Sequence, residues 1–219
     1  MPNLPPWGDV RSRALRADTS TIRGLISSTV VGQLVTATTT GPLATLVPWV
    51  HHDDGTEYGC LRGHLARTND QWRTPHIGDA LVIMSGANGY ISPSWYAAKA
   101  EHGRVVPTWN KTEVQIRGEF IVHDDATWLR ELVSDLTARH EANREMPWSI
   151  DDAPPEFIDA QLRAIVGIEV RVASVEASVK MSQNRPVTDL AGIIDGLNAD
   201  GHHDLAAHVA EANSDRTAP

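Results

Sequence analysis

The chain has 219 residues, of which 41% are hydrophobic, and its formal net charge at pH 7 is −9. This length is enough for one sizeable core with appended elements, and the negative charge disfavours nucleic-acid binding, which depends on basic residues that neutralise phosphates. The stretch 1–18 is polar and unlike a signal peptide, no segment has the composition of a membrane span, and the single cysteine, Cys60, cannot form an internal disulfide. We therefore expect a cytoplasmic protein that does not associate with membranes.

The N-terminal part of the chain predicts a helix followed by strands. Thr19 or Ser20 can cap a short helix, and the turn signals Thr40-Gly41-Pro42 and Asp53-Asp54-Gly55 separate stretches that are β-branched or apolar. The predicted elements are a helix over 20–28 and strands over 30–38, 43–50 and 56–63. Strands joined by such short turns predict an antiparallel meander.

The remainder of the chain mixes strands and helices. Apolar and polar residues alternate from 113 to 122, as in a half-buried strand, whereas 80–84 is apolar throughout, as in a buried strand. Asp124 or Asp125 can cap a helix, and Pro154-Pro155 suits the first turn of another. The predicted elements are a helical turn over 69–75, strands over 80–84, 113–122 and 166–179, helices over 126–143, 154–164 and 186–197, and a polar, weakly helical tail from 198.

Two non-periodic stretches, Tyr90–Tyr96 and Val106–Asn110, combine aromatic, proline, hydroxyl and amide side chains. Their prolines disfavour both a helix and a central strand, and their aromatic content argues against disorder. A rigid loop of this composition suits a flat heteroaromatic ligand, and it equally suits a lid over the core. The local chemistry does not separate these two interpretations.

The order of the elements differs from the regular alternation of a parallel α/β sheet. It predicts an α+β fold that is mainly β, in which a small antiparallel barrel carries attached helices. We expect an N-terminal extension over 1–18, one structural domain over 19–197 with a helical insertion at about 125–164, and a polar C-terminal tail over 198–219.

Other polar clusters are weaker candidates for sites. His51 and His52 are adjacent on a predicted strand and point to opposite faces, so they do not readily share a metal ion. His202, His203 and His208 lie in the polar tail, where a surface position is the simpler interpretation. The nucleophile pattern GxSxG and the phosphate loops GxGxxG and GxxxxGKS/T do not occur in the sequence. The sequence therefore predicts no metal site.

Four segments, taken in order along the chain, carry a specific pattern. They are Gly32–Val35 with Gly41–Pro48 (GQLV, GPLATLVP), Gly63–Trp72 (GHLARTNDQW), Tyr90–Tyr96 with Lys99 and Val105–Asn110 (YISPSWY, VVPTWN), and Lys180–Pro186 (KMSQNRP). Any one of them would be a weak signal. Together they resemble the PaiB-type family of FMN-binding negative transcriptional regulators, and the resemblance extends from about Thr19 to Leu197.

The resemblance implies a split β-barrel like that of the pyridoxamine-phosphate-oxidase-type flavoproteins, in which two chains form a homodimer and FMN lies in each of two clefts between subunits. We expect Arg67 to bind the flavin phosphate, because a guanidinium fork matches phosphate oxygens; an ion pair with Asp70 is the alternative role. The cofactor-binding residues implied by the resemblance are Thr45, His64, Leu65, Ala66, Arg67, Asn69, Gln71, Thr108, Trp109, Asn110, Lys180, Gln183, Asn184 and Arg185.

The resemblance also implies a cavity above the flavin. Its expected lining residues are Leu46, Trp95, Tyr96 and Lys111. The family usually has histidine in place of Leu46 and an aromatic residue in place of Lys111, so these departures bear on the choice of substrate. His64 and Lys180 are candidate catalytic residues, the first as an acid or base and the second as a group that stabilises charge on the reduced ring.

Three functions remain open at this point. The first is an FMN-dependent oxidoreductase that acts on a small-molecule substrate or a nicotinamide. The second is an FMN-binding transcriptional regulator, as the family name says, and the third is a flavin sensor without turnover. We favour the oxidoreductase, because the sequence has no helix-turn-helix signature and its charge is unfavourable for DNA.

Overall fold

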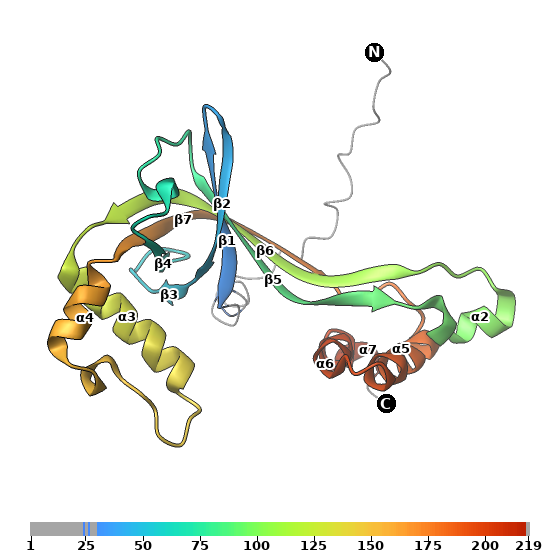
Figure 1. Cartoon of the computed structure of the whole chain (residues 1–219). Coiled ribbons are helices and arrows are strands. Elements are labelled where there is room, and N and C mark those ends of the chain that lie inside the picture. Colours follow the sequence, from blue (N-terminus) through green and yellow to red (C-terminus); the bar gives the residue numbers. More distant parts are fainter. Residues whose placement is uncertain (1–23, 25, 27–29, 218–219) are drawn as a thin grey trace, which may run out of the picture. The chain divides into compact units, whose positions relative to one another are not determined.

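The computed structural model describes residues 24, 26 and 30–217 (Figure 1). The N-terminal extension and most of the helix predicted over 20–28 lie outside the described residues. The strands are β1 (Val31–Thr38), β2 (Gly41–Pro48), β3 (Val50–His52), β4 (Cys60–Ala66), β5 (Ala80–Ile91), β6 (Thr108–His123) and β7 (Ile165–Lys180). The helices are η1 (Asp70–Trp72), η2 (Pro93–Trp95), α2 (Ala97–His102), α3 (Ala126–Glu141), η3 (Ile150–Asp152), α4 (Pro155–Leu162), α5 (Val187–Ala199), α6 (His203–Glu211) and α7 (Ser214–Thr217). None of the helices within this described range is both long and apolar enough to cross a membrane.

The seven strands form one sheet in the order β2-β1-β5-β6-β7-β4-β3. β1 and β2 form an antiparallel hairpin in which Thr38 lies opposite Gly41, and β3 and β4 also pair antiparallel. The two hairpins occupy opposite ends of the strand order, so the predicted meander over 30–63 is wrong. Turn signals identify strands that are joined locally, but they do not specify which strands lie on the other side of each hairpin.

Trp49 alone separates β2 from β3, although these strands occupy opposite ends of the strand order. The sheet therefore curls until its two ends meet, which is the geometry of a barrel. Trp49 is 1% exposed. Its backbone N–H donates to the Val30 carbonyl at 2.7 Å, and its indole N–H donates to the Gly32 carbonyl at 3.3 Å. The predicted fold class, a mainly β split barrel with attached helices, is confirmed.

The chain divides into two compact units, and β5, β6 and β7 contribute residues to both. The described part of the first, called the barrel unit here, comprises residues 24, 26, 30–84 and 114–176. The described part of the second, called the C-terminal unit, comprises residues 85–113 and 177–217.

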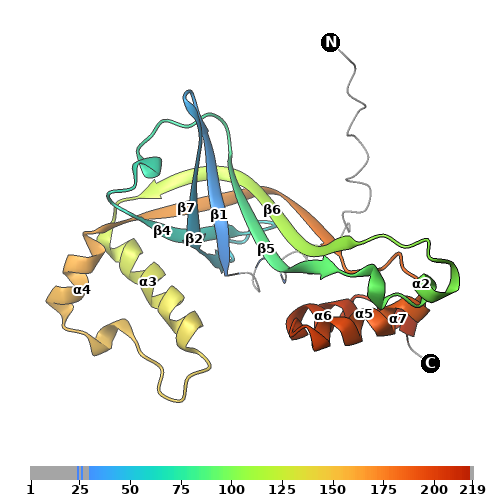
Figure 2. The same cartoon turned by 45° about the vertical axis from the view of Figure 1, so that its right-hand side comes forward.

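In the barrel unit, α3 and α4 lie together and pack around Leu129, Ile158 and Leu162 (Figure 2). Of the two predicted candidates, Asp124 and Asp125, it is Asp125 that caps α3, because its carboxylate accepts a hydrogen bond from the Trp128 backbone N–H at 2.7 Å. The cap therefore leaves the preceding residue, Asp124, free for other contacts.

In the C-terminal unit, α5, α6 and α7 lie side by side (Figure 2). The core of this unit contains Ile193 and Leu197 of α5 together with Leu205 and Val209 of α6. The expectation of a weakly helical, polar tail is therefore wrong for α6, which is a regular helix with a buried face. Leu205 and Val209 are one turn apart and share that face, but the polar residues around them dominate the composition.

The two stretches that were expected to form one aromatic loop are partly strand. β5 continues to Ile91 and β6 begins at Thr108, because the two strands are neighbours in the sheet and supply each other's backbone hydrogen bonds. Between them, Ser92 caps η2 by accepting a hydrogen bond from the Ser94 N–H at 3.2 Å. α2 then ends at His102, and the next residue, Gly103, caps it with a φ of +65°, which favours glycine.

Candidate functional site

Thr45, Asn69 and Gln71, three residues of the predicted cofactor set, form one hydrogen-bonded network in the barrel unit. Asn69 Nδ2 donates to Thr45 Oγ1 at 2.9 Å, and Thr45 Oγ1 donates to Gln71 Oε1 at 2.7 Å. Asn69 also caps η1, because its Oδ1 accepts from the Gln71 backbone N–H at 2.8 Å. The network holds the turn that follows β4 against β2.

Gln71 anchors this network in the core, where it is 3% exposed. Its Nε2 lies 3.1 Å from Thr36 Oγ1 and 3.3 Å from each of the carbonyl oxygens of Leu34 and Leu43. Two hydrogens serve three acceptors, so one of them is shared. Amide and hydroxyl groups therefore fix the position of the turn before any ligand binds.

His64 lies in β4 opposite Gly167 and carries a buried polar atom, Nδ1, that has no hydrogen-bond partner among the described residues. Burial lowers the pKa of the imidazole below its ordinary value of 6.5, so the ring is neutral at pH 7. A neutral ring with one open nitrogen can exchange a hydrogen bond or a proton with a ligand. His64 Nδ1 and His123 Nε2 are the two buried side-chain polar atoms in the described barrel unit that have no hydrogen-bond partner.

Replacing His64 with glutamine is expected to make the stability of the protein less sensitive to acid. The folded-state pKa is lowered because burial penalises the charged ring. As the pH falls below about 6.5, the unfolded state binds a proton that the folded state does not, and the free energy of unfolding decreases until the pH reaches the folded pKa. His123, whose pKa is also lowered by burial, adds to the loss and stays in the variant. Urea unfolding at a series of pH values measures the effect, and equal pH dependence in both proteins would contradict it.

Arg67 and Asp124 are brought together by the order of the strands. β4 and β6 lie on either side of β7, and β4 runs antiparallel to β7. The last residue of β6, His123, lies near the start of β7, because a Cβ placed on Gly167 would be 3.0 Å from its carbonyl oxygen. The residues that follow β4 and β6 therefore meet at the end of the sheet where β7 begins.

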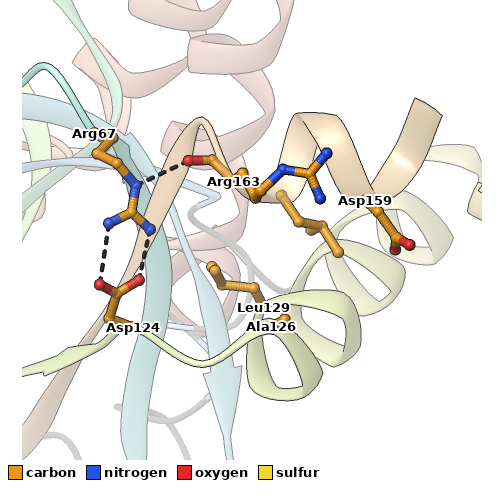
Figure 3. A pocket seen from close by; sticks show the side chains of 7 residues that line it. Arg67, Asp124, Ala126, Leu129, Asp159 and Arg163 are labelled. Atoms are coloured by element: carbon orange, nitrogen blue, oxygen red, sulfur yellow. Dashed lines mark hydrogen bonds and ion pairs between the residues drawn. The ribbon is translucent and has the colours of Figure 1, made fainter. Parts of the chain in front are cut away.

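Arg67 uses most of its donors within the chain. Nη1 and Nη2 donate to the two carboxylate oxygens of Asp124 at 3.0 and 2.5 Å, and Nε donates to the Arg163 carbonyl at 2.8 Å (Figure 3). Nη2 also donates to the Ile165 carbonyl at 3.1 Å. Asp70, the alternative partner considered for Arg67, pairs with another arginine. The hydrogen bonds from Arg67 lower the pKa of the Asp124 carboxyl, which favours its ionised form in this bidentate pair.

A cavity of about 350 Å³ opens beside this ion pair. Its lining residues are Arg67, Asp124, Ala126, Leu129, Asp159, Leu162 and Arg163 (Figure 3). Asp159 pairs with Arg130 at 2.6 Å. The guanidinium of Arg163 has no hydrogen bond or ion pair to any described residue. The cavity therefore contains one cation that no carboxylate of the described chain neutralises.

In the C-terminal unit, a second group of predicted residues gathers at the start of β6 and the end of β7. Lys180 Nζ donates to Thr108 Oγ1. Asn110 is fully buried and exchanges hydrogen bonds with the hydroxyl of Ser182, at 3.0 and 3.3 Å. Ser182 was not among the predicted residues, although it lies within the KMSQNRP motif. Its φ of +62° is uncommon for a residue other than glycine, and the bond to Asn110 helps to hold this turn.

The residues that follow Ser182 close the same turn. Gln183 Oε1 accepts from the Met181 backbone N–H at 2.7 Å. The guanidinium of Arg185 lies over the ring of Tyr96, 4.3 Å from its centroid, where a cation is attracted to the aromatic face. Asn184 is exposed. Two of these three predicted residues therefore have internal partners.

Trp95 and Tyr96, which were predicted to line the cavity above the flavin, pack within the C-terminal unit. A Cβ on Gly192 would lie 2.0 Å from the Trp95 carbonyl oxygen, and one on Gly196 would lie 2.3 Å from its ring. Tyr96 is buried, and its hydroxyl has no hydrogen-bond partner among the described residues. The sequence signal for the Trp95 contact was the pair of glycines in α5, Gly192 and Gly196, which are one helical turn apart. We did not predict this contact.

Three other predicted residues lie at or near the surface. Leu46 on β2 is 60% exposed and Trp109 on β6 is 54% exposed. Trp109 Nε1 donates to Asn88 Oδ1 at 3.3 Å, and Lys111 pairs with Glu113 at 3.4 Å. Leu46 and Trp109 thus each present apolar surface to water.

The predicted cofactor residues thus belong to two groups, one in each unit. The barrel-unit group is Thr45, His64, Leu65, Ala66, Arg67, Asn69 and Gln71, and the C-terminal group is Thr108, Trp109, Asn110, Lys180, Gln183, Asn184 and Arg185. Leu65 is buried and Ala66 is exposed. The chemistry of the set fits FMN: a guanidinium fork that already holds two anionic oxygens suits a phosphate, and the open His64 nitrogen suits a polar ligand.

Comparison with known proteins gives concordant results. The profile of a family described as "Putative FMN-binding domain" matches residues 10–174. The chain is 32% identical over 186 residues to "Protease synthase and sporulation protein PAI 2" of Bacillus subtilis, and the match covers 84% of this chain and 86% of that protein.

Many solved structures share the fold, and two of them are compared with this chain. A conserved hypothetical protein, Rv2991, from Mycobacterium tuberculosis has a TM-score of 0.56 at 11% identity, covering 80% of this chain and 92% of that one. An FAD and heme binding protein from Mycobacterium smegmatis has a TM-score of 0.53 at 13% identity, covering 77% of this chain and 72% of that one.

Proposed function

The chain belongs to the PaiB-type family of FMN-binding domains, and from this premise we propose that it is an FMN flavoprotein that acts as an oxidoreductase on a small molecule. The observation that carries the proposal is the family match, which includes β1 to β6, extends into β7 and includes every predicted cofactor residue of the barrel unit. The residues of the KMSQNRP motif lie beyond this match, so their assignment depends on the motif alone.

Each part of the site has a proposed role. FMN supplies a ring that exchanges a hydride with its substrate. Arg67 binds the phosphate, and the strand 43–47 binds the ring. In the C-terminal unit, residues 108–110 are a second segment with a ring-binding role. Lys180 stabilises negative charge on the reduced ring, and His64, neutral at pH 7 and with one open nitrogen, accepts or donates a proton.

We propose further that the working molecule is a homodimer with a flavin at each subunit interface. The exposed apolar side chains of Leu46 and Trp109 support this, because a partner chain would remove them from water. Leu46 and Lys111 replace residues that the family usually has, so we expect a substrate that differs from that of relatives with the usual pair.

An absorption spectrum of the purified protein supplied with FMN is the direct test. We expect a bound-flavin spectrum, bleaching by NADH or NADPH, and a light-scattering mass of twice the 23.9 kDa chain. Absence of flavin binding would refute the proposal, and a flavin-loaded monomer would refute the dimer. Flavin binding without turnover, combined with sequence-specific retention of DNA at physiological ionic strength, would instead support a regulator.

A further inference from the structure

The Arg67 fork is already filled by an anion of the same chain. The two Asp124 oxygens lie 3.0 and 2.5 Å from Nη1 and Nη2, in the bidentate arrangement in which a guanidinium also binds two oxygens of a phosphate. We propose that Asp124 competes with the FMN phosphate for Arg67 and so sets the affinity of the protein for phosphorylated flavins. The inference rests on the proposed function, and on Arg67 as the phosphate ligand.

The exchange of one anion for the other is physically reasonable. The side chains of Arg67 and Asp124 are 36% and 56% exposed, and ion pairs at this exposure contribute little to stability. A phosphate dianion carries more negative charge than a carboxylate and has three terminal oxygens that accept hydrogen bonds. The phosphate therefore displaces the carboxylate, but the lost ion pair lowers the affinity that is observed.

Asp124 can leave Arg67 without damage to the elements on either side. β6 ends at the preceding residue, His123, and α3 is capped by the following residue, Asp125, whose carboxylate binds the Trp128 N–H. Asp124 thus belongs to the connection between strand and helix, and its carboxylate has no role in capping. A residue in this position is able to change partners as the ligand binds.

The cavity beside the pair becomes a better site for an anion once Asp124 has turned away. Arg163 lines it with a guanidinium that has no partner among the described residues, and the negative charge of Asp159 is balanced by Arg130. Arg67 and Arg163 would then be two cations of the cavity that no carboxylate offsets. Two cations suit a dianion, whereas uncharged riboflavin gains nothing from them.

Binding of FMN and of riboflavin, measured by flavin fluorescence titration with wild-type protein and with Asp124→Asn, tests the competition. The amide keeps the size of the side chain and removes its charge. We expect FMN affinity to rise by up to about fivefold, the range of an exposed ion pair, and riboflavin affinity to stay the same. Asp159→Asn is the matched control, because it removes the same charge from the lining of the same cavity but from the partner of Arg130.

The variant Arg67→Ala distinguishes an error in the phosphate assignment from an error in the proposed competition. It should lower FMN affinity by roughly 10- to 100-fold, as expected for lost bonds to a charged group, and leave riboflavin affinity unchanged; Arg67→Lys, which lacks the fork, is used if the alanine variant does not fold. No FMN binding by the wild type would refute the proposed function itself. Unchanged FMN affinity in Arg67→Ala would refute the phosphate assignment and leave flavin binding intact. Three results would refute the competition alone: Asp124→Asn does not raise the affinity for FMN, it raises the affinity for riboflavin equally, or Asp159→Asn raises the affinity for FMN as much.

Discussion

Trp49→Ala is expected to lower the free energy of unfolding by about 3–5 kcal/mol, as for other buried tryptophans cut back to alanine. Trp49 is 1% exposed and is the single residue between β2 and β3, which lie at opposite ends of the sheet order. The variant loses the packing of the indole and its hydrogen bond to the Gly32 carbonyl. Because this corner joins the two ends of the sheet, we expect the barrel unit as a whole to lose stability.

Urea unfolding followed by far-UV circular dichroism measures this loss without relying on tryptophan fluorescence. Trp148→Ala is the matched control, because Trp148 lies in the same unit and is 46% exposed. Its replacement should change the free energy of unfolding by less than about 1 kcal/mol, as is usual for surface positions. Similar losses in the two variants would show that the corner has no special role in closing the barrel.

Gln71→Ala is expected to cost more than about 2 kcal/mol of stability, because it leaves several buried polar groups without partners. The amide accepts from the Thr45 hydroxyl and donates to Thr36 Oγ1 and to the carbonyl oxygens of Leu34 and Leu43. Thermal or urea unfolding measures the loss. We also expect weaker FMN binding, because the turn that carries the proposed phosphate ligand is no longer held against β2.

A control variant and a double-mutant cycle test whether the effect of Gln71→Ala comes from its buried network. Gln33→Ala removes the same side chain from an exposed position on the neighbouring strand β1, and it should be close to neutral. Thr45→Val should cost less in the Gln71→Ala background than in the wild type, because its hydroxyl has then already lost its acceptor. Additive effects of the two changes would show that Thr45 and Gln71 do not act as one network.

Much of the secondary structure follows from local chemistry. Asp124 or Asp125 was predicted to cap α3, and Asp125 does so by binding a backbone N–H three residues away; η1 lies within the helical turn predicted over 69–75. Within the Gly63–Trp72 segment, Asn69 caps η1 by accepting a hydrogen bond from the Gln71 backbone N–H. Interactions of this range are encoded by neighbouring residues, and so they can be read directly from the sequence.

Other features depend on which distant segments lie side by side. The pair of Arg67 and Asp124 joins residues 57 positions apart and exists because β4 and β6 both flank β7. The closure of the barrel at Trp49 and the burial of α6 also depend on contacts between segments that are distant in the sequence. Strand partners are selected by the burial of the whole sheet, and no short stretch of sequence contains that information. For this reason Arg67 could be proposed as a phosphate ligand from its motif, whereas its ion-pair partner Asp124 could be identified only from the folded chain.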